Sequence, residues 1–131
     1  MQLIALADYW MGRDKTHPAD MTPEIRSNAA DLVARCNQLA ADLPFALPRV
    51  SSGWRPPSIN AGVKGAAKRS NHMTGNAVDF ADPDGKLDAW CLANLPALER
   101  IGLWLEHPDA TPNWCHLQRV PPRSGRRVFR P

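Results

Sequence analysis

Hydrophobic residues recur at helical spacing after Thr22. The apolar positions are Ile25, Ala29, Leu32, Val33, Cys36, Leu39 and Ala40. Thr22 is a favourable N-cap, Pro23 suits the first helical position, and Pro44 stops the pattern. The pattern therefore predicts an amphipathic helix between Thr22 and Pro44. Shorter apolar patterns predict a helical turn within residues 3–10 and a further helix within residues 87–95.

Four short segments have the composition of β-strands. They cover residues 49–54, 76–81, 102–106 and 113–118. Each is rich in Val, Leu, Trp or Phe and is bounded by Pro, Gly, Asn or Asp. The 131 residues fit one domain, and no repeat or linker divides them. The expected fold is α+β: a single domain over residues 1–131, with helices packed on a small, mostly antiparallel sheet.

Cysteine content and hydropathy exclude several classes of protein. The three cysteines include no Cys-x-x-Cys pair, and their odd number argues against a disulfide framework and a thiolate zinc finger. No apolar run reaches the roughly 18–20 residues that a membrane span needs. The first residues lack the basic and apolar regions of a signal peptide. We therefore expect synthesis in the cytoplasm without a signal peptide, and no membrane span.

Positive charge is concentrated near the end of the sequence. The net charge is +3, and residues 119–131 hold five arginines and no acidic residue. From its charge alone, such a basic tail can contact any polyanion, including nucleic acid, anionic lipid or an anionic cell-wall polymer, and a solvated end is the alternative. Nucleic acid is not an expected partner, because no basic helix or interleaving of aromatic and basic residues supports it.

A histidine and an aspartate in the segment 70–79 are candidate metal ligands. His72 and Asp79 lie seven positions apart, with Gly75 between them. The glycine would allow a sharp turn, and Asp79 would project from the following strand toward the imidazole. This arrangement suits a metal ion. A buried hydrogen bond between His72 and Asp79 is the alternative.

The last two predicted strands carry a second cluster. The strand period of two places Trp114, His116 and Gln118 on one face, and it places Trp104 and Glu106 together. A symmetric hairpin would pair Glu106 with Trp114 and Trp104 with His116. Glu106 would then be the diagonal neighbour of His116, within about 7–8 Å. A carboxylate beside a ligand imidazole is what a water-activating metal site requires.

Three motifs resemble those of a known family. They are Ser-Gly-Trp-Arg at residues 52–55 with Asn60 following, Ser-x-His-x-x-Gly-x-Ala-x-Asp at residues 70–79, and Trp-x-His at residues 114–116. Together they resemble the zinc D-Ala-D-Ala metallopeptidases, over residues 50–118. This group includes D,D-carboxypeptidases, bacteriophage L-alanyl-D-glutamate endolysins and proteins with the hedgehog fold. The resemblance implies a hedgehog-like, D-Ala-D-Ala-peptidase-like domain.

The resemblance also implies a set of site residues. Zinc would be held by His72, Asp79 and His116, with a water in the fourth position. Arg55 would steady a substrate or transition-state oxygen; a surface arginine in a salt bridge is the alternative. From the residues themselves, Ser70, Gln118 and Trp114 are candidate substrate contacts beside Arg55. The alternatives are a turn serine, an ordinary edge-strand amide and core packing of the tryptophan. Cys115 points to the opposite side of its strand and is expected to pack in the core.

The general base departs from the family pattern. Many members carry an acid three residues before the last histidine, but this position is Asn113, which cannot accept the proton. Glu106 is therefore our choice, supported by the hairpin argument and by family members with a glutamate on the preceding strand. Asp109, in the loop, is the second candidate.

Together with these residues, the resemblance implies a zinc-dependent peptidoglycan peptidase. It would use a metal-activated water to hydrolyse an amide bond in a stem peptide or cross-link, as an endopeptidase or a D,D-carboxypeptidase. We expect a monomer of bacteriophage type that acts on the cell wall after release or as a phage-associated protein. The alternative, which Asn113 permits, is a non-catalytic zinc-containing module of the same fold that binds a peptide or a protein.

Overall fold

A computed structural model describes residues 3–131 and confirms the α+β fold. The helices are α1 Leu6–Trp10, α2 Arg13–Thr16, α3 Pro23–Asp42, α4 Pro57–Ala61, α5 Lys86–Ala93 and α6 Leu95–Ile101, with 3-10 turns η1 Pro18–Asp20 and η2 Pro108–Ala110. The strands are β1 Val50–Ser52, β2 Ala77–Ala81, β3 Trp104–Glu106, β4 Trp114–Gln118 and β5 Val128–Phe129. They form one sheet in the order β1-β2-β4-β3-β5. All neighbours in the sheet are antiparallel except β3 and β5, which are parallel.

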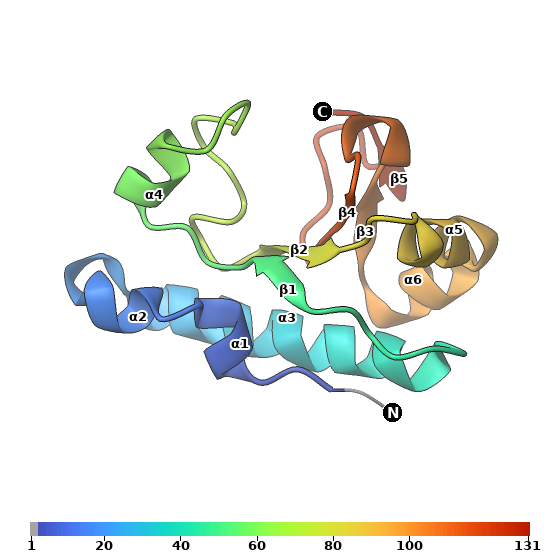
Figure 1. The fold of residues 1–131 in the computed structure, drawn as a ribbon, viewed down its shortest axis with the longest axis horizontal. Coiled ribbons are helices and arrows are strands. Elements are labelled where there is room, and N and C mark those ends of the chain that lie inside the picture. The colour runs from blue at the N-terminus through green and yellow to red at the C-terminus, as the bar shows by residue number, and fades with distance from the viewer. Residues whose placement is uncertain (1–2) are drawn as a thin grey trace.

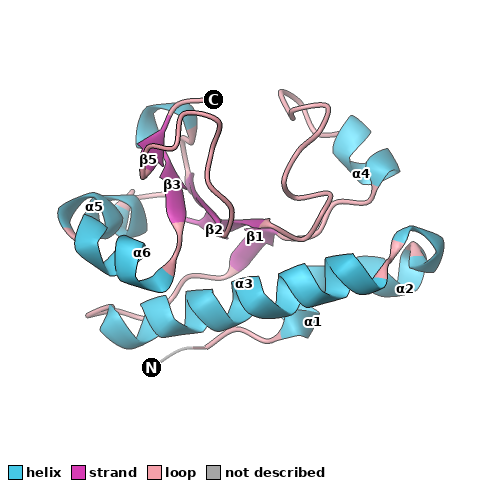
Figure 2. Cartoon of the chain, turned by 180° about the vertical axis from the view of Figure 1, so that it is seen from behind, coloured by secondary structure: helices cyan, strands magenta, loops and turns pink. Residues whose placement is uncertain are grey.

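The two faces of the sheet have different roles. The long helix α3 runs beneath the sheet, together with α1, and α5 and α6 pack beside it (Figures 1 and 2). Val78 and Phe80 of β2 and Cys115 and Leu117 of β4 are fully buried in the core. Because side chains alternate along a strand, the residues between them, Asp79 and His116, point away from that core. The sheet therefore presents its polar side chains on the face opposite α3.

Helix α3 begins as the sequence predicts. The hydroxyl oxygen of Thr22 accepts a hydrogen bond of 3.1 Å from the backbone N–H of Ile25, and Pro23 occupies the first turn. All of the predicted apolar positions except Ile25 are buried, and Ile25 packs against the edge of the core. The helix also receives the loop that carries His72. A Cβ at Gly75, whose φ is +78°, would lie 2.8 Å from the carbonyl oxygen of Ile25, so only glycine fits this turn without strain.

The predicted hairpin register is wrong by two residues. Trp104 pairs with Gln118 and Leu105 with Leu117, so continuing the ladder places Glu106 opposite His116. The connection is asymmetric because it contains the turn η2 and ends at Asn113, whose φ is +75°. The connection therefore uses more residues on the side of β4 than a symmetric loop would. A shift of two keeps every side chain on its predicted face, so Glu106 and His116 remain on the same side of the sheet.

Segment 119–131 takes part in the fold. Arg119 donates to Asp31 at 2.7 Å and to Asn76 at 2.8 Å. The guanidinium of Arg127 lies 4.2 Å from the centre of the Trp104 ring, and β5 extends the sheet. Arg123, Arg126 and Arg130 remain exposed. Contact of these exposed arginines with anionic wall polymers stays a prediction.

All three cysteines lie inside the fold. Cys36, Cys91 and Cys115 are buried, and none forms a disulfide. Cys115 packs in the core as predicted. Within residues 3–131, no helix has the length and apolar character required to cross a membrane.

A buried aspartate in α5 should make stability depend on pH. Burial raises the pKa of Asp88 to about 6, and one of its carboxylate oxygens has no hydrogen-bond partner. The folded state therefore binds more protons than the unfolded state between about pH 4 and pH 6, so this group lowers stability as the pH rises through that window.

We expect Asp88→Asn to remove this pH-dependent loss. The stability of the variant relative to that of the parent should rise by on the order of 1 kcal/mol, about 3–5 °C in Tm, as the pH is raised from about 4.5 to about 7.5. Thermal melts of both proteins at the two pH values provide the measurement. An unchanged difference in Tm would show that Asp88 does not titrate in this range.

Candidate metal centre

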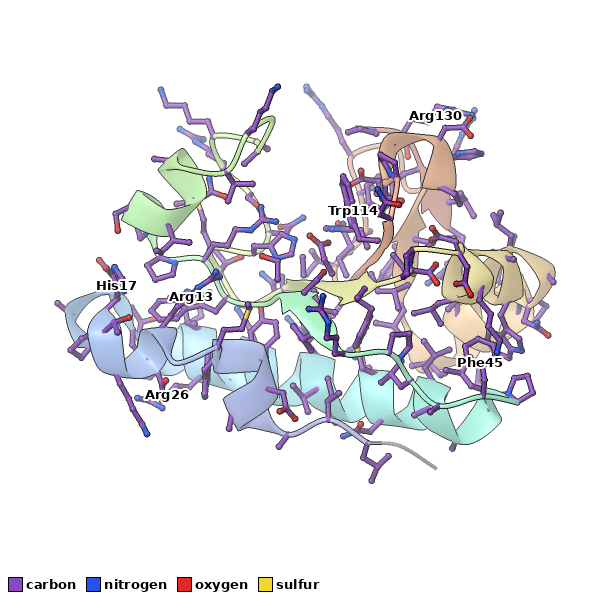
Figure 3. All side chains as sticks on the ribbon, in the orientation of Figure 1. Arg13, His17, Arg26, Phe45, Trp114 and Arg130 are labelled. Carbon is purple, nitrogen blue, oxygen red and sulfur yellow. The ribbon has the colours of Figure 1, made fainter. Side chains whose placement is uncertain are left out.

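A cleft of about 460 Å³ lies on the face of the sheet opposite α3. Its floor is formed by residues of β2 and β4, including Asp79 and His116. The loop after α4 forms one wall, and residues near β3, β4 and β5 form the other. These two parts of the chain stand on opposite sides of β2 (Figure 1). Trp114 projects from β4 on the side facing the loop (Figure 3).

The structure brings the three predicted metal ligands together. Asp79 and His116 are direct cross-strand partners, and His72 reaches the same point from the loop that Gly75 closes. Oδ1 of Asp79 lies 2.9 Å from Nδ1 of His116 and 3.3 Å from Nε2 of His72. One ligand atom from each residue lies within 4.8 Å of the other two. All three side chains are buried.

A backbone carbonyl determines which nitrogen of His72 faces this point. Nδ1 of His72 lies 2.9 Å from the carbonyl oxygen of Gly53, which can only accept a hydrogen bond, so Nδ1 carries the proton. Nε2 is then the free acceptor, and it faces Asp79. Only glycine fits at position 53, because a Cβ there would lie 1.9 Å from the carbonyl oxygen of Tyr9. The sequence Ser-Gly-Trp-Arg thus orients a candidate ligand.

Gln118 performs the equivalent function for His116. The amide nitrogen of Gln118 donates to the carbonyl oxygen of Val120 at 2.9 Å, so its Oε1 faces His116. Oε1 accepts the proton of His116 Nε2 over 2.9 Å, which leaves Nδ1 as the free acceptor. This hydrogen bond holds the imidazole with Nδ1 toward Asp79. Histidines that bind metals are generally oriented in this way.

The result is a buried group of three acceptors that needs a positive charge. Two imidazole nitrogens and a carboxylate oxygen face one another, and both histidines have already used their ring protons elsewhere. Either extra protons or a cation must lie between them. Two imidazoles and one carboxylate are a common donor set for catalytic zinc. The residues present therefore fit a zinc ion.

The electrostatics of the three groups agree with this. Burial lowers the pKa of His72, although the charge of Asp79 opposes the effect. Burial also disfavours protonation of His116, but its hydrogen bond with Asp79 and the charge of that carboxylate outweigh it and raise the pKa. For Asp79, burial acts to raise the pKa, but the charges and hydrogen bonds of the two histidines outweigh burial and lower the pKa overall. The carboxylate therefore stays ionised. Asp79 therefore offers a permanent negative charge.

Arg55 supports the candidate ligand Asp79 as well as lining the cleft. Its Nη2 donates to Oδ2 of Asp79 at 3.1 Å, and its Nε donates to the Ser52 hydroxyl at 2.9 Å. The side chain is only 8% exposed, so it is not a surface arginine. Because Arg55 holds Oδ2, the other carboxylate oxygen is left for the histidines. Arg55 thus forms a salt bridge, as in the alternative, but it does so inside the cleft and not at the surface.

Glu106 is the candidate base that lies in the cleft. It is half-buried on the wall beside His116. Burial raises its pKa, the charges of His116 and Arg55 lower it, and that of Asp79 raises it. Asp109 is exposed, lies outside the cleft lining and pairs with Arg130 at 3.2 Å.

The other predicted substrate-binding residues also line the cleft. They are Ser70, Trp114 and Gln118. Ser70 has a local role too, since its hydroxyl oxygen accepts the backbone N–H of His72 at 3.1 Å. The sequence analysis did not identify Phe129, whose ring lies edge-on to His116 with 6.1 Å between centroids. Its two-residue strand gives no periodic signal.

Comparison with known proteins places this site in a family. The family model for Peptidase M15 matches residues 14–102, well over half of the chain. This span includes His72 and Asp79 and ends before Glu106 and His116, which the sheet brings to the same cleft. No curated protein and no solved structure gives a significant match. The extent of the family match, together with the His-Asp-His group, shows that this chain belongs to the Peptidase M15 family of metallopeptidases.

Proposed function

We propose that the protein is a zinc-dependent peptidoglycan peptidase that hydrolyses an amide bond in a stem peptide or a cross-link. One observation carries the proposal. Three acceptor atoms of His72, Asp79 and His116 converge in a cleft that also contains the half-buried carboxylate of Glu106. Peptidase M15 membership supports a peptidase in general. Beyond this general activity, we propose the peptidoglycan substrate and the type of bond that is cut.

His72, Asp79 and His116 would hold the zinc ion. When bound, zinc acts as a Lewis acid that makes a water more acidic and polarises the carbonyl to be attacked. The chain contributes the orientation of the ligands. Gly53 and Gln118 fix the free nitrogens of the two histidines, and Arg55 fixes the carboxylate of Asp79.

Glu106 moves the proton. It accepts a proton from water as the oxygen attacks the peptide carbonyl, and it gives that proton to the leaving amine as the C–N bond breaks. The products are a carboxylic acid and an amine, so atoms and charge balance. Arg55, which lines the same cleft, would stabilise negative charge on the carbonyl oxygen.

The experiment compares hydrolysis with and without metal. The purified protein is incubated with purified cell walls and with soluble muropeptides, and the products are identified by mass spectrometry. We expect new amine and carboxyl ends, loss of activity with a chelator and recovery with zinc. A protein that holds stoichiometric zinc but releases no product from any wall type would instead be the non-catalytic binding module.

Gln118 offers a separate test of ligand orientation. Gln118→Ala removes the acceptor that holds His116 Nε2–H, so the imidazole should rotate more freely. We expect zinc affinity to fall about 10–100-fold, measured by competition with a chelator. Gln118→Glu keeps an acceptor at this position and should retain more of the affinity. Equal loss in both variants would show that the hydrogen bond does not orient the ligand.

A further inference from the structure

One wall of the cleft carries unbalanced positive charge. This wall is residues 62–71, the loop between α4 and the His72 turn, and we call it the cationic loop. It contains Lys64, Lys68 and Arg69 and no acidic residue. Lys64 and Arg69 line the cleft, whereas Lys68 does not. All three side chains are exposed.

The two cleft-lining cations have no counter-charge of their own. Within residues 3–131, neither Lys64 nor Arg69 makes an ion pair or a side-chain hydrogen bond. In the same cleft, Arg55 is already paired with Asp79, and the carboxylate of Glu106 lies on the other wall. The cationic loop therefore offers two donors to a ligand in the cleft.

Hydrogen bonds within this segment fix the course of the loop. The side-chain amide of the buried Asn60 donates to the carbonyl oxygen of Ala67 at 2.9 Å, and the N–H of Ala66 donates to the carbonyl oxygen of Val63 at 3.1 Å. Arg69 precedes His72 by three residues, a distance of at most about 10–11 Å along an extended chain. That length corresponds to about three residues of an extended peptide substrate.

We infer that the cationic loop, through Lys64 and Arg69, binds a carboxylate of the substrate that lies within a few residues of the bond to be cut. The inference rests on the proposed peptidase function, since it assigns the substrate of that same cleft. An arginine and a lysine can bind a carboxylate through charge-assisted hydrogen bonds. The substrate class is thus an anionic peptide, and a neutralised peptide should bind less well.

A stem peptide offers two sources of this carboxylate. One is the C-terminal carboxylate, and the other is the free carboxylate of a glutamate linked through its side chain. Three synthetic pentapeptides distinguish them: the free acid, a C-terminal amide and a form in which the glutamate carboxylate is an amide. Binding is measured on the zinc-loaded Glu106→Gln variant, in which turnover is suppressed.

Amidation of the recognised carboxylate should weaken binding about three- to tenfold, as expected for partly exposed charge pairs. The same loss should appear when Lys64→Ala and Arg69→Ala are combined, and amidation should then have no further effect. Lys68→Ala is the matched control, because this lysine belongs to the same loop but not to the cleft lining. The Lys68→Ala variant should keep the preference for the free acid over the amidated peptide. The preference should also diminish at high salt.

Two results would overturn the inference. All three peptides could bind equally well when the cationic loop is unchanged, or the preference for the free acid could persist when Lys64→Ala and Arg69→Ala are combined. Turnover by the protein with Glu106 intact is scored separately. Discrimination without turnover would reject the proposed peptidase and retain the anion site, whereas turnover without discrimination would reject the anion site alone.

Discussion

Replacement of His116 by alanine should remove most of the zinc from the protein. The change leaves two donor side chains where three converge. Because loss of an outer hydrogen-bond partner alone costs about 10–100-fold in affinity, loss of a ligand should cost more than about 100-fold. Metal analysis after dialysis measures this directly. Zinc should also raise the Tm of the parent and not that of the variant.

Two controls make this test specific to the site. Cys115→Ser changes the residue next to His116, but Cys115 faces the core, so the variant should keep its zinc. His107→Ala removes a histidine that lies outside the cleft lining and should have no effect on metal content. Stoichiometric zinc in His116→Ala would refute the ligand assignment.

Local sequence signals were sufficient for the main elements of the fold. Helix α3 combines a regular apolar pattern with an N-cap at Thr22 and a proline beyond its end, so several independent signals agree. Strand β5 contains only Val128 and Phe129, and its position depends on pairing with β3 and on the contact of Arg127 with Trp104. These are tertiary contacts between distant segments. No periodicity within a segment could reveal them.

The same distinction between local sequence signals and tertiary contacts applies to the candidate site. The convergence of His72, Asp79 and His116 could be predicted because the motifs that carry these residues resemble those of the metallopeptidases. The hairpin register could not, since it depends on the asymmetric connection before β4. The orientation of each imidazole could not be predicted from the sequence either. It depends on carbonyl groups of Gly53 and Val120, and every residue has a carbonyl group, so the sequence carries no mark of them.

Glu106→Gln should retain zinc and the folded state but slow hydrolysis of muropeptides by about 10²–10⁴-fold. This is the usual cost of losing a positioned general base. Glutamine has nearly the same shape as glutamate, so it should keep the packing of the half-buried side chain while losing the ability to accept a proton. The loss should appear in kcat, with a smaller effect on KM, because binding contacts elsewhere in the cleft remain. Metal analysis, Tm and rate are measured on the same preparation.

Asp109→Asn is the matched control, because it makes the same chemical change in the adjacent loop. Asp109 is exposed, pairs with Arg130 and lies outside the cleft lining, so the variant should hydrolyse muropeptides at the parental rate. Parental activity in Glu106→Gln together with loss in Asp109→Asn would move the base to the loop. Such a result would require η2 to rearrange when substrate binds, because in this structure the carboxylate that shares the cleft with His116 is that of Glu106.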